Sequence, residues 1–496
     1  MSFDEFLHKK RQMIPRWHTY QVARWSGLLD HTGETLETEI KGNIEEAKQN
    51  WAEKSHLPQA SELVGAATLQ NSFAIEEAIA AARFILDSPK ASQLAASLAK
   101  NYLQLSSGTH EPFPDIILPE NARPYWDVLA NIKKQLREYP QNYIKWAELS
   151  FFYATIGQNE KAKDAMQIAI NGNSENRFLL LSASRFFLHI DEGDLSLFYL
   201  RKAIRNNPDP WVISAEIAIS DSLGEDPKEY RRGLKVLNYE NVGDFNKSEL
   251  AGAIGTLEAK SGEVKSAKKF LKTALIAPTE NTLAQAVFLL PHLGNSQDIK
   301  SRLTSNKSSF EAEAQLFYAD GKYEQALNSI ISWLKYQPFS SRPALHGSFI
   351  ASLALEKHDE AIRIAKLGLL SSPHEFMLQN NMAFSLISLN RTDEAESILN
   401  KIDSSKLSKS SQAVITATQG ALAFRKGNPE AGRKLYSSAV DVFDSLKDDR
   451  SKALAFYHWS REEDRLETPF VKDLNDRINN LLKKTPLKEI ELKLKK

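Results

Sequence analysis

One spacing repeats along this chain of 496 residues and constrains its fold more than any other feature. In the window that begins at Tyr143, large apolar residues hold the fourth, seventh and eleventh places, and small residues hold the fifteenth, twentieth and twenty-seventh. These residues are Trp146, Leu149, Tyr153, Gly157, Ala162 and Ala169. Large apolar residues three, four and seven apart form one buried helix face, and small residues let a second helix approach closely. The window therefore predicts two helices joined by a tight turn.

The same places recur in six further windows. They begin at Arg177, Ser248, Lys307, Arg342, Phe376 and Ala413. A single helical hairpin cannot bury its apolar face, so the recurrence predicts hairpins stacked into a solenoid. Two intervals, 211–247 and 282–306, fit the spacing poorly, and we interpret them as degenerate helical pairs that continue the stack. Gly and Pro number only 21 and 19, which also favours helices over a β-rich fold with many turns.

These places and their period of about 34 residues resemble the tetratricopeptide repeat (TPR). The resemblance implies an all-α, right-handed superhelix whose concave inner wall, built from the first helix of each repeat, contacts a protein or peptide. In the family, contacts concentrate at the second, fifth, ninth, twelfth and thirteenth places of a repeat. At such places we expect partner-binding residues Phe151, Arg185, His189, Tyr318, His346, Asn380, Phe384, Phe424 and Arg425.

Composition excludes several classes of function. Lys and Arg together number 63, as do Asp and Glu, so the net charge is zero, which argues against a nucleic-acid partner. The chain has no Cys, which excludes disulfides and cysteine-ligated metals. Nucleotide-binding glycine loops, the G-x-S-x-G elbow and the H-E-x-x-H motif are absent. We therefore predict no catalytic, cofactor-binding or metal-binding residue and no cofactor.

The regions outside the array have distinct compositions. We predict an N-terminal helical region over 1–105, which includes a degenerate TPR-like hairpin, and a Pro-rich connector over 106–124. The array is expected over 125–440, followed by capping helices and a Lys-rich tail over 441–496. From Lys483 onward we expect a frayed, solvated tail. The sequence begins with charged residues and contains no apolar run of membrane-spanning length, so we expect a soluble, cytoplasmic protein.

The stretch from Lys9 to Trp25, "KKRQMIPRWHTYQVARW", mixes basic and aromatic residues. Surfaces that bind single-stranded nucleic acid use this mixture for phosphate contacts and base stacking. Acidic residues flank the stretch on both sides, however, so we favour a packing helix with a solvated basic face over a nucleic-acid site.

Together these observations favour a non-enzymatic scaffold or adaptor that holds a protein or peptide partner and leave its oligomeric state open. The stretch "ATQGALAFRKGNPEAGRKLYSSAV" is similar to the final repeats of bacterial TPR proteins that act beside toxin or phage-defence modules. That resemblance implies an assembly or regulatory role in such a system. The alternative is an enzymatic or nucleic-acid-acting N-terminal module that the repeats target to its substrate.

Overall fold

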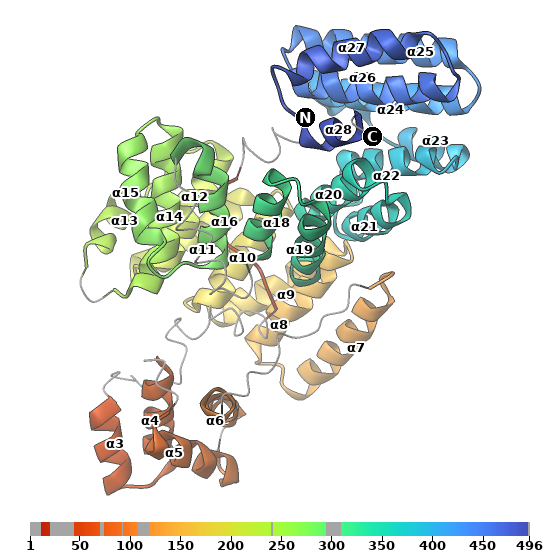
Figure 1. Cartoon of the computed structure of the whole chain (residues 1–496). Coiled ribbons are helices and arrows are strands. Elements are labelled where there is room, and N and C mark those ends of the chain that lie inside the picture. The colour runs from red at the N-terminus through yellow and green to blue at the C-terminus, as the bar shows by residue number, and fades with distance from the viewer. Residues whose placement is uncertain are drawn as a thin grey trace.

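The structure, a computed structural model, is a helical solenoid with an additional helical group at its N-terminal end (Figure 1). It describes residues 11–19, 44–69, 74–91, 93–107, 119–239, 242–293 and 309–494. Within these ranges all regular secondary structure is helical. The predicted all-α solenoid is therefore confirmed.

Among the described residues, four helices form the N-terminal group, which lies apart from the solenoid (Figure 1). They are α3 (Ile44–Glu53), α4 (Leu57–Leu69), α5 (Glu76–Asp87) and α6 (Gln93–Ser106). The group has its own apolar core, in which Ala78 and Ala82 are fully buried. The predicted connector over 106–124 lies mostly outside the described residues.

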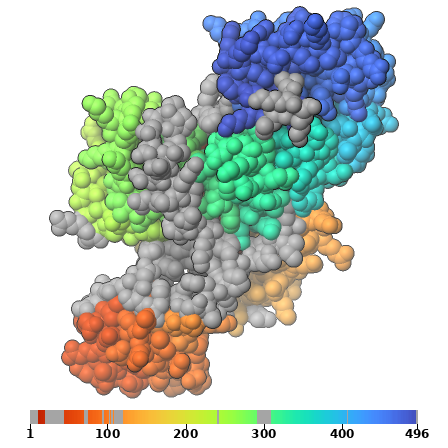
Figure 2. All heavy atoms as spheres, in the orientation of Figure 1, coloured from red at the N-terminus to blue at the C-terminus, as the bar shows by residue number. Residues whose placement is uncertain are grey.

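The solenoid follows as a succession of helices, most of which are joined by short turns within the described ranges. Its first half contains α7 (Arg123–Glu138), α8 (Tyr143–Thr155), α9 (Asn159–Gly172), α10 (Arg177–His189), α11 (Gly193–Asn206), α12 (Pro210–Leu223), α13 (Tyr230–Leu237), α14 (Asp244–Lys260), α15 (Val264–Ala274) and α16 (Glu280–Leu293). Its second half contains α18 (Phe310–Ala319), α19 (Tyr323–Tyr336), α20 (Ser341–Phe349), the π-helix η1 (Ile350–Ala354), α21 (His358–Ser371), α22 (Phe376–Ser388), α23 (Thr392–Leu399) and the short 3-10 helix η2 (Ser404–Lys406). The C-terminal end, rounded in Figure 2, contains α24 (Lys409–Arg425), α25 (Pro429–Ser445), α26 (Asp449–Arg465), α27 (Phe470–Leu482) and α28 (Lys488–Leu494).

Each repeat turns at the same place. In all seven windows the fifteenth residue has a positive φ, which reverses the chain after the first helix. These residues are Gly157, Asp191, Gly262, Gly321, Glu356, Asn390 and Gly427. Gly adopts this left-handed conformation without steric cost, whereas the other residues adopt it at a cost of about 1 kcal/mol or more. The common turn geometry is therefore kept even where Gly is missing.

Close helix packing depends on the twentieth place of each window. The residue there is small and buried in every window: Ala162, Ser196, Ala267, Ala326, Ala361, Ala395 and Gly432. In the last of these, an added Cβ would lie 2.4 Å from a ring carbon of Phe424. The second helix of each hairpin thus packs at a distance that excludes a larger side chain.

Of the two degenerate intervals, 211–247 is mainly a helical pair, α12 and α13. Asp209 caps α12 by accepting hydrogen bonds from the amides of Trp211 and Val212, and Gly224 ends the helix in the left-handed conformation. In the other interval α16 extends to residue 293, and residues 294–308 lie outside the described ranges.

The solenoid coils far enough for its second half to contact the inner wall of its first half. Phe339, in the turn between α19 and α20, lies 5.5 Å from Phe151 of α8, measured between ring centroids. It also contacts Arg185 and His189 of α10. Nearby, an added Cβ on Gly157 would lie 2.5 Å from the carbonyl oxygen of Leu370 in α21. These contacts close a groove between α8, α10, α16, α18 and the α19–α20 turn.

Two sequence-based expectations for the ends of the chain are wrong. Residues 11–19, expected within a packing helix, contain no helix. Pro15 lies inside this range and lacks the amide that a helix interior needs. The expected frayed tail is instead packed as far as α28, with Leu487 and Ile490 buried. The buried carboxylate of Glu489 pairs with Arg450 of α26 at 2.7 Å, which fixes α28 to the solenoid.

Candidate functional site

Residues Arg11–Thr19, here called the inner segment, lie in the groove of the solenoid. They form the short dark-red stretch near the centre of Figure 1. Arg11, Met13 and Trp17 are between 1% and 3% exposed, as buried as the solenoid's own core. Met13 and Trp17 belong to the same apolar cluster as residues of α8, α10, α12 and α14. The groove thus buries one side of a non-helical piece of chain, and residues 12, 14, 16 and 19 remain partly exposed.

An aromatic cage surrounds Trp17. The centroid of its ring lies 5.2 Å from that of Phe151, 5.6 Å from Phe186 and 4.9 Å from Phe339. The interplanar angles are between 58° and 84°, so each ring meets the indole at its edge or at a tilt. Such pairs contribute about 0.5–1.5 kcal/mol each beyond burial. The cage combines both halves of the solenoid, because Phe339 comes from the second half.

A buried carboxylate binds the guanidinium of Arg11. The Nε and Nη2 atoms of Arg11 each donate to a different oxygen of Glu311, both at 3.1 Å. Nη1 donates to Oε1 of Gln285 at 2.5 Å, and Nη2 donates to Oδ1 of Asn281 at 2.9 Å. The two-pronged contact with Glu311 matches the planar fork of an arginine. Every guanidinium nitrogen of Arg11 therefore has a partner on α16 or α18.

Glu311 is the centre of a larger charge cluster. Besides Arg11, it accepts hydrogen bonds from Arg16 of the inner segment and from Arg342 of α20, the latter at 2.9 Å. Burial alone would raise the pKa of Glu311, but the three guanidinium groups outweigh burial and hold that pKa well below its usual range. Burial lowers the pKa of Arg11 to about 10. Both groups are therefore charged at neutral pH, and the cluster is a buried ionic contact between the inner segment and the wall.

Helix α16 also binds the backbone of the inner segment. Nε2 of Gln285 donates to the carbonyl oxygen of Arg11, and Nδ2 of Asn281 donates to that of Ile14, both at 3.2 Å. Residues four apart lie on the same face of a helix, so these two amides point into the groove together. Hydrogen bonds to backbone carbonyls do not depend on side-chain identity. The two amides can therefore bind the backbone of a non-helical chain of any sequence. Specificity comes from the contacts that the wall makes with the side chains of Arg11, Arg16 and Trp17.

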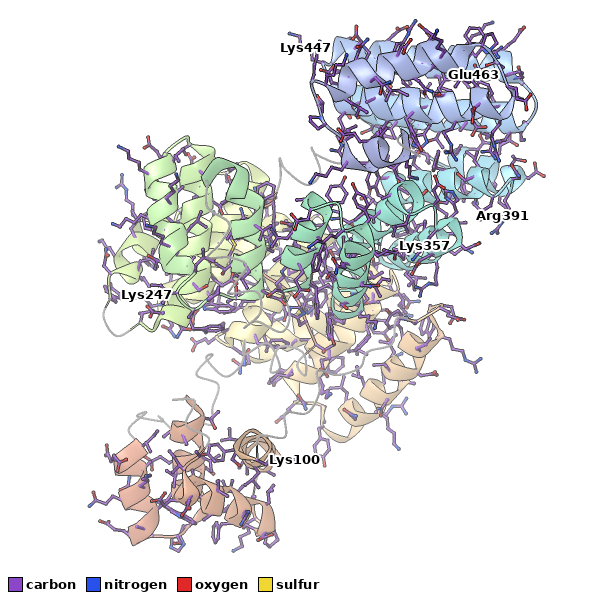
Figure 3. The ribbon with its side chains drawn as sticks, viewed as in Figure 1. Lys100, Lys247, Lys357, Arg391, Lys447 and Glu463 are labelled. Atoms are coloured by element: carbon purple, nitrogen blue, oxygen red, sulfur yellow. The ribbon has the colours of Figure 1, made fainter. Side chains whose placement is uncertain are left out.

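Further polar contacts extend along the inner segment. Nε2 of Gln12 donates to Oδ2 of Asp221 in α12 at 2.8 Å. His18 contacts Oε1 of Glu280 in α16 at 2.7 Å through Nε2. With Glu311, these acidic residues give the wall a charge opposite to that of the segment. Figure 3 shows the density of side chains in this central part of the solenoid.

Three of the sequence-predicted residues lie together in this groove. Phe151 is part of the cage, Arg185 places its guanidinium carbon 4.9 Å from the ring centroid of Phe339, and His189 meets the same ring edge-on. Burial, and then the charge of Arg185, lower the pKa of His189 to about 4, so it is neutral at neutral pH. Phe151 is buried against Trp17 of the inner segment, whereas Arg185 and His189 are half-buried beside Phe339.

The other sequence-predicted residues lie elsewhere. His346, Asn380 and Phe384 line a cavity between α20, α22, α24 and α26. The hydroxyl of Tyr318 donates to Glu489 at 3.1 Å and so ties α18 to α28. The remaining two serve packing within the C-terminal repeats: Phe424 is buried against Tyr436, and Arg425 forms a two-pronged ion pair with Glu462.

Sequence reasoning missed the acidic and amide side of the groove. Glu311 holds the fifth place of its window, which is a contact place, but it was not among the expected partner-binding residues. Asn281 and Gln285 fall where the spacing is degenerate. A signal was present there, because Glu280 and Asn281 are adjacent polar residues and Gln285 follows Asn281 by four residues in a largely apolar helix. Phe339 lies in a turn and has no place in the repeat pattern.

Comparison with known proteins was made at the level of sequence families, individual sequences and solved structures. No protein-family model matches the chain, and no curated protein matches it in sequence. Among solved structures, yeast Tom70 covers 75% of this chain and 91% of its own length at 14% identity, with a TM-score of 0.31. The human IFIT1 dimer with m7Gppp-AAAA covers 93% and 99% at 16% identity, with a TM-score of 0.28. Likenesses of this strength carry no inference about what this chain binds.

The class that the repeats and the groove define is a TPR-like helical solenoid. Within the described ranges, no group of His, Asp and Glu side chains has the arrangement of a metal site. No helix there combines the length and the apolar character needed to cross a membrane.

Proposed function

We propose that this protein is a non-enzymatic scaffold that binds an extended, basic segment of a partner protein in the groove of its solenoid. In the free chain the inner segment occupies the groove, and a partner segment of similar chemistry competes with it. The partner segment would carry arginines at the positions of Arg11 and Arg16 and an aromatic residue at that of Trp17.

The single observation that carries this proposal is the double recognition of the inner segment. Asn281 and Gln285 bind its backbone, whereas Glu311 and the cage around Trp17 bind its side chains. Internal packing of a terminus requires burial of apolar residues but does not require amides aimed at its carbonyl groups. Recognition of both backbone and anchors is how grooves hold extended peptides.

Competition follows from the covalent link between segment and groove. A tethered segment has an effective concentration in the millimolar range, so a free peptide of equal affinity displaces it poorly. A partner therefore needs either additional contacts outside the groove or a higher affinity for it. The inner segment therefore prevents basic peptides of low affinity from binding in the groove.

The test uses a variant whose own segment is weakened, Arg11→Ala with Trp17→Ala, and a fluorescent peptide of residues 11–19, RQMIPRWHT. Fluorescence anisotropy should show the peptide binding to the double variant and at least about tenfold more weakly to the parent chain, because the intact segment competes. A peptide with Ala at the tryptophan position is the control and should lose most of its affinity. No peptide binding to a double variant that keeps its helical circular dichroism would contradict the proposal.

The proposal extends the sequence-based expectations of a cytoplasmic location and of a role in a bacterial toxin or phage-defence system. Its support for the first is the composition, and for the second the similarity of residues 417–440 to such repeats. Recovery of the native complex and identification of its partner test both extensions.

A further inference from the structure

A second hollow lies in the C-terminal half of the solenoid, separate from the groove. It has a volume of about 160 Å³ and lies between α20, η1, α22, α24 and α26. None of its lining residues also lines the hollow spaces beside the inner segment. For comparison, an engineered apolar protein cavity of about 150 Å³ binds benzene. The space is therefore sufficient for one aromatic ring.

The lining of this cavity is apolar and uncharged. Phe349, Leu353, Phe384 and Phe443 contribute apolar surface, and no Asp, Glu, Lys or Arg is among the residues that line it. His458 also lines it, and burial lowers the pKa of this histidine to about 3, so the ring is neutral at neutral pH. A charged ligand would lose its hydration in the cavity and find no counter-charge there. The site therefore selects for an uncharged ligand.

Asn380 brings a buried hydrogen-bond acceptor to the lining of the cavity. The side-chain oxygen of Asn380 is buried without a partner, and the residue is 5% exposed. The neighbouring Asn381, by contrast, donates to Oγ of Ser348 at 3.0 Å. An unsatisfied buried polar atom costs about 1–3 kcal/mol, which a ligand donor would recover. Asn380 thus gives a largely apolar cavity a directional contact for a ligand donor.

The backbone beside the cavity is also irregular. The five residues of η1 form a π-helix in place of the α-helix found in the first helix of the other repeats, and Ser352 and Leu353 of this turn line the cavity. π-helical turns are rare and occur frequently at functional sites. Size, neutral lining, buried acceptor and π-helix are four separate observations at one place.

From these observations we propose that the cavity is a binding site for an uncharged aromatic compound of one ring that donates a single hydrogen bond to Asn380. Phe384, in edge contact with His458 at 4.5 Å, would form one wall of the site. Phenol is the simplest compound with this chemistry. The site goes beyond the proposed groove function and does not depend on it.

Calorimetric titration of the full chain with three probes tests the chemistry of the ligand. Phenol should bind at one site per chain, about fivefold to tenfold more tightly than benzene, which corresponds to one net hydrogen bond. Benzoate, which has a similar ring and a negative charge, should not bind measurably. Absence of phenol binding, or equal binding of benzoate, would overturn the proposal.

Two variants locate the site. Ala417→Phe fills the cavity from α24 and should abolish phenol binding, whereas the matched control Ala423→Phe, on another face of the same helix, should not. Asn380→Leu removes the acceptor at similar size, so phenol should bind no better than benzene while benzene binding is kept. If Ala417→Phe fails to fold, the ratio of phenol to benzene affinity in Asn380→Leu decides alone. An unchanged ratio in that variant would refute the role of Asn380.

Discussion

Replacement of Trp17 by Ala should release the inner segment without unfolding the solenoid. The indole is 1% exposed and contacts three aromatic rings, so its removal leaves a large void in the groove. Removal of a buried Trp costs about 3–5 kcal/mol, and here the cost falls on the docked state of the segment. At about 1.4 kcal/mol per factor of ten, this raises the population of the undocked state at least a hundredfold.

Trypsin measures this population, because the peptide bond after Arg16 is cleavable only when the segment leaves the groove. Cleavage should accelerate at least about a hundredfold in Trp17→Ala, in the regime where cleavage follows the open population. Trp126→Ala is the matched control, because Trp126 is 44% exposed on α7, and it should leave the rate unchanged. A rate within about threefold of the parent would refute the reasoning. Loss of helical circular dichroism together with release would show instead that the segment is part of the global fold.

Three further predictions concern charge, pH and packing. Glu311→Gln leaves buried arginines without their counter-charge and should weaken docking by about 3–5 kcal/mol, seen as faster tryptic cleavage, whereas Glu324→Gln, at an exposed ion pair, should not. His346 and His458 have folded-state pKa values lowered to about 3, below their ordinary value near 6.5, so unfolding takes up protons below pH 6.5. The free energy of unfolding of the C-terminal half, measured with denaturant, should therefore fall by about 1.4 kcal/mol per pH unit for each histidine as pH falls from 6.5 toward 3. A free energy of unfolding that does not change over this pH range would contradict the prediction. Ala326→Arg forces a long charged side chain into a fully buried helix contact and should cost about 3 kcal/mol or more, so unfolding within about half a kcal/mol of the parent would disprove the assigned register.

The repeat geometry was predictable because it is encoded locally. Helices α8, α10 and α22 begin at the first residues of their windows, Tyr143, Arg177 and Phe376. Each hairpin needs a turn residue and small residues at fixed distances along the chain, and these leave a sequence signal. The signal persists even where Gly is replaced, as at Asn390, because the other places of the window still match.

The groove was not predictable in the same way, because it depends on contacts between distant residues. Arg11 and Glu311 are 300 residues apart, and no local pattern pairs them. The degree of coiling that brings Phe339 to Phe151 is the sum of small rotations between repeats, which the place pattern does not specify. Arg185 and His189 were expected to contact a partner, but in the structure both contact Phe339 of the α19–α20 turn.

The C-terminal tail shows how composition alone can mislead. Its many lysines indicated solvation, yet Leu487, directly before α28, and Ile490 within it are both buried. Glu489 fixes this helix through a buried ion pair with Arg450, and the sequence pattern alone does not pair these two residues.

The most direct test of the central claim, that the inner segment occupies the groove, is a distance measurement between the two. The chain has no native Cys, so introduced pairs report without background. Gln12→Cys with Asp221→Cys replaces two side chains that meet at 2.8 Å, and a short bifunctional thiol reagent should link them within one chain, as mass spectrometry would show. Gln12→Cys with Lys447→Cys, placed at the C-terminal end of the molecule in Figure 3, is the control and should remain unlinked. Efficient linkage of the first pair alone is the predicted result. Absence of that link, or equal linkage of both pairs, would contradict the account.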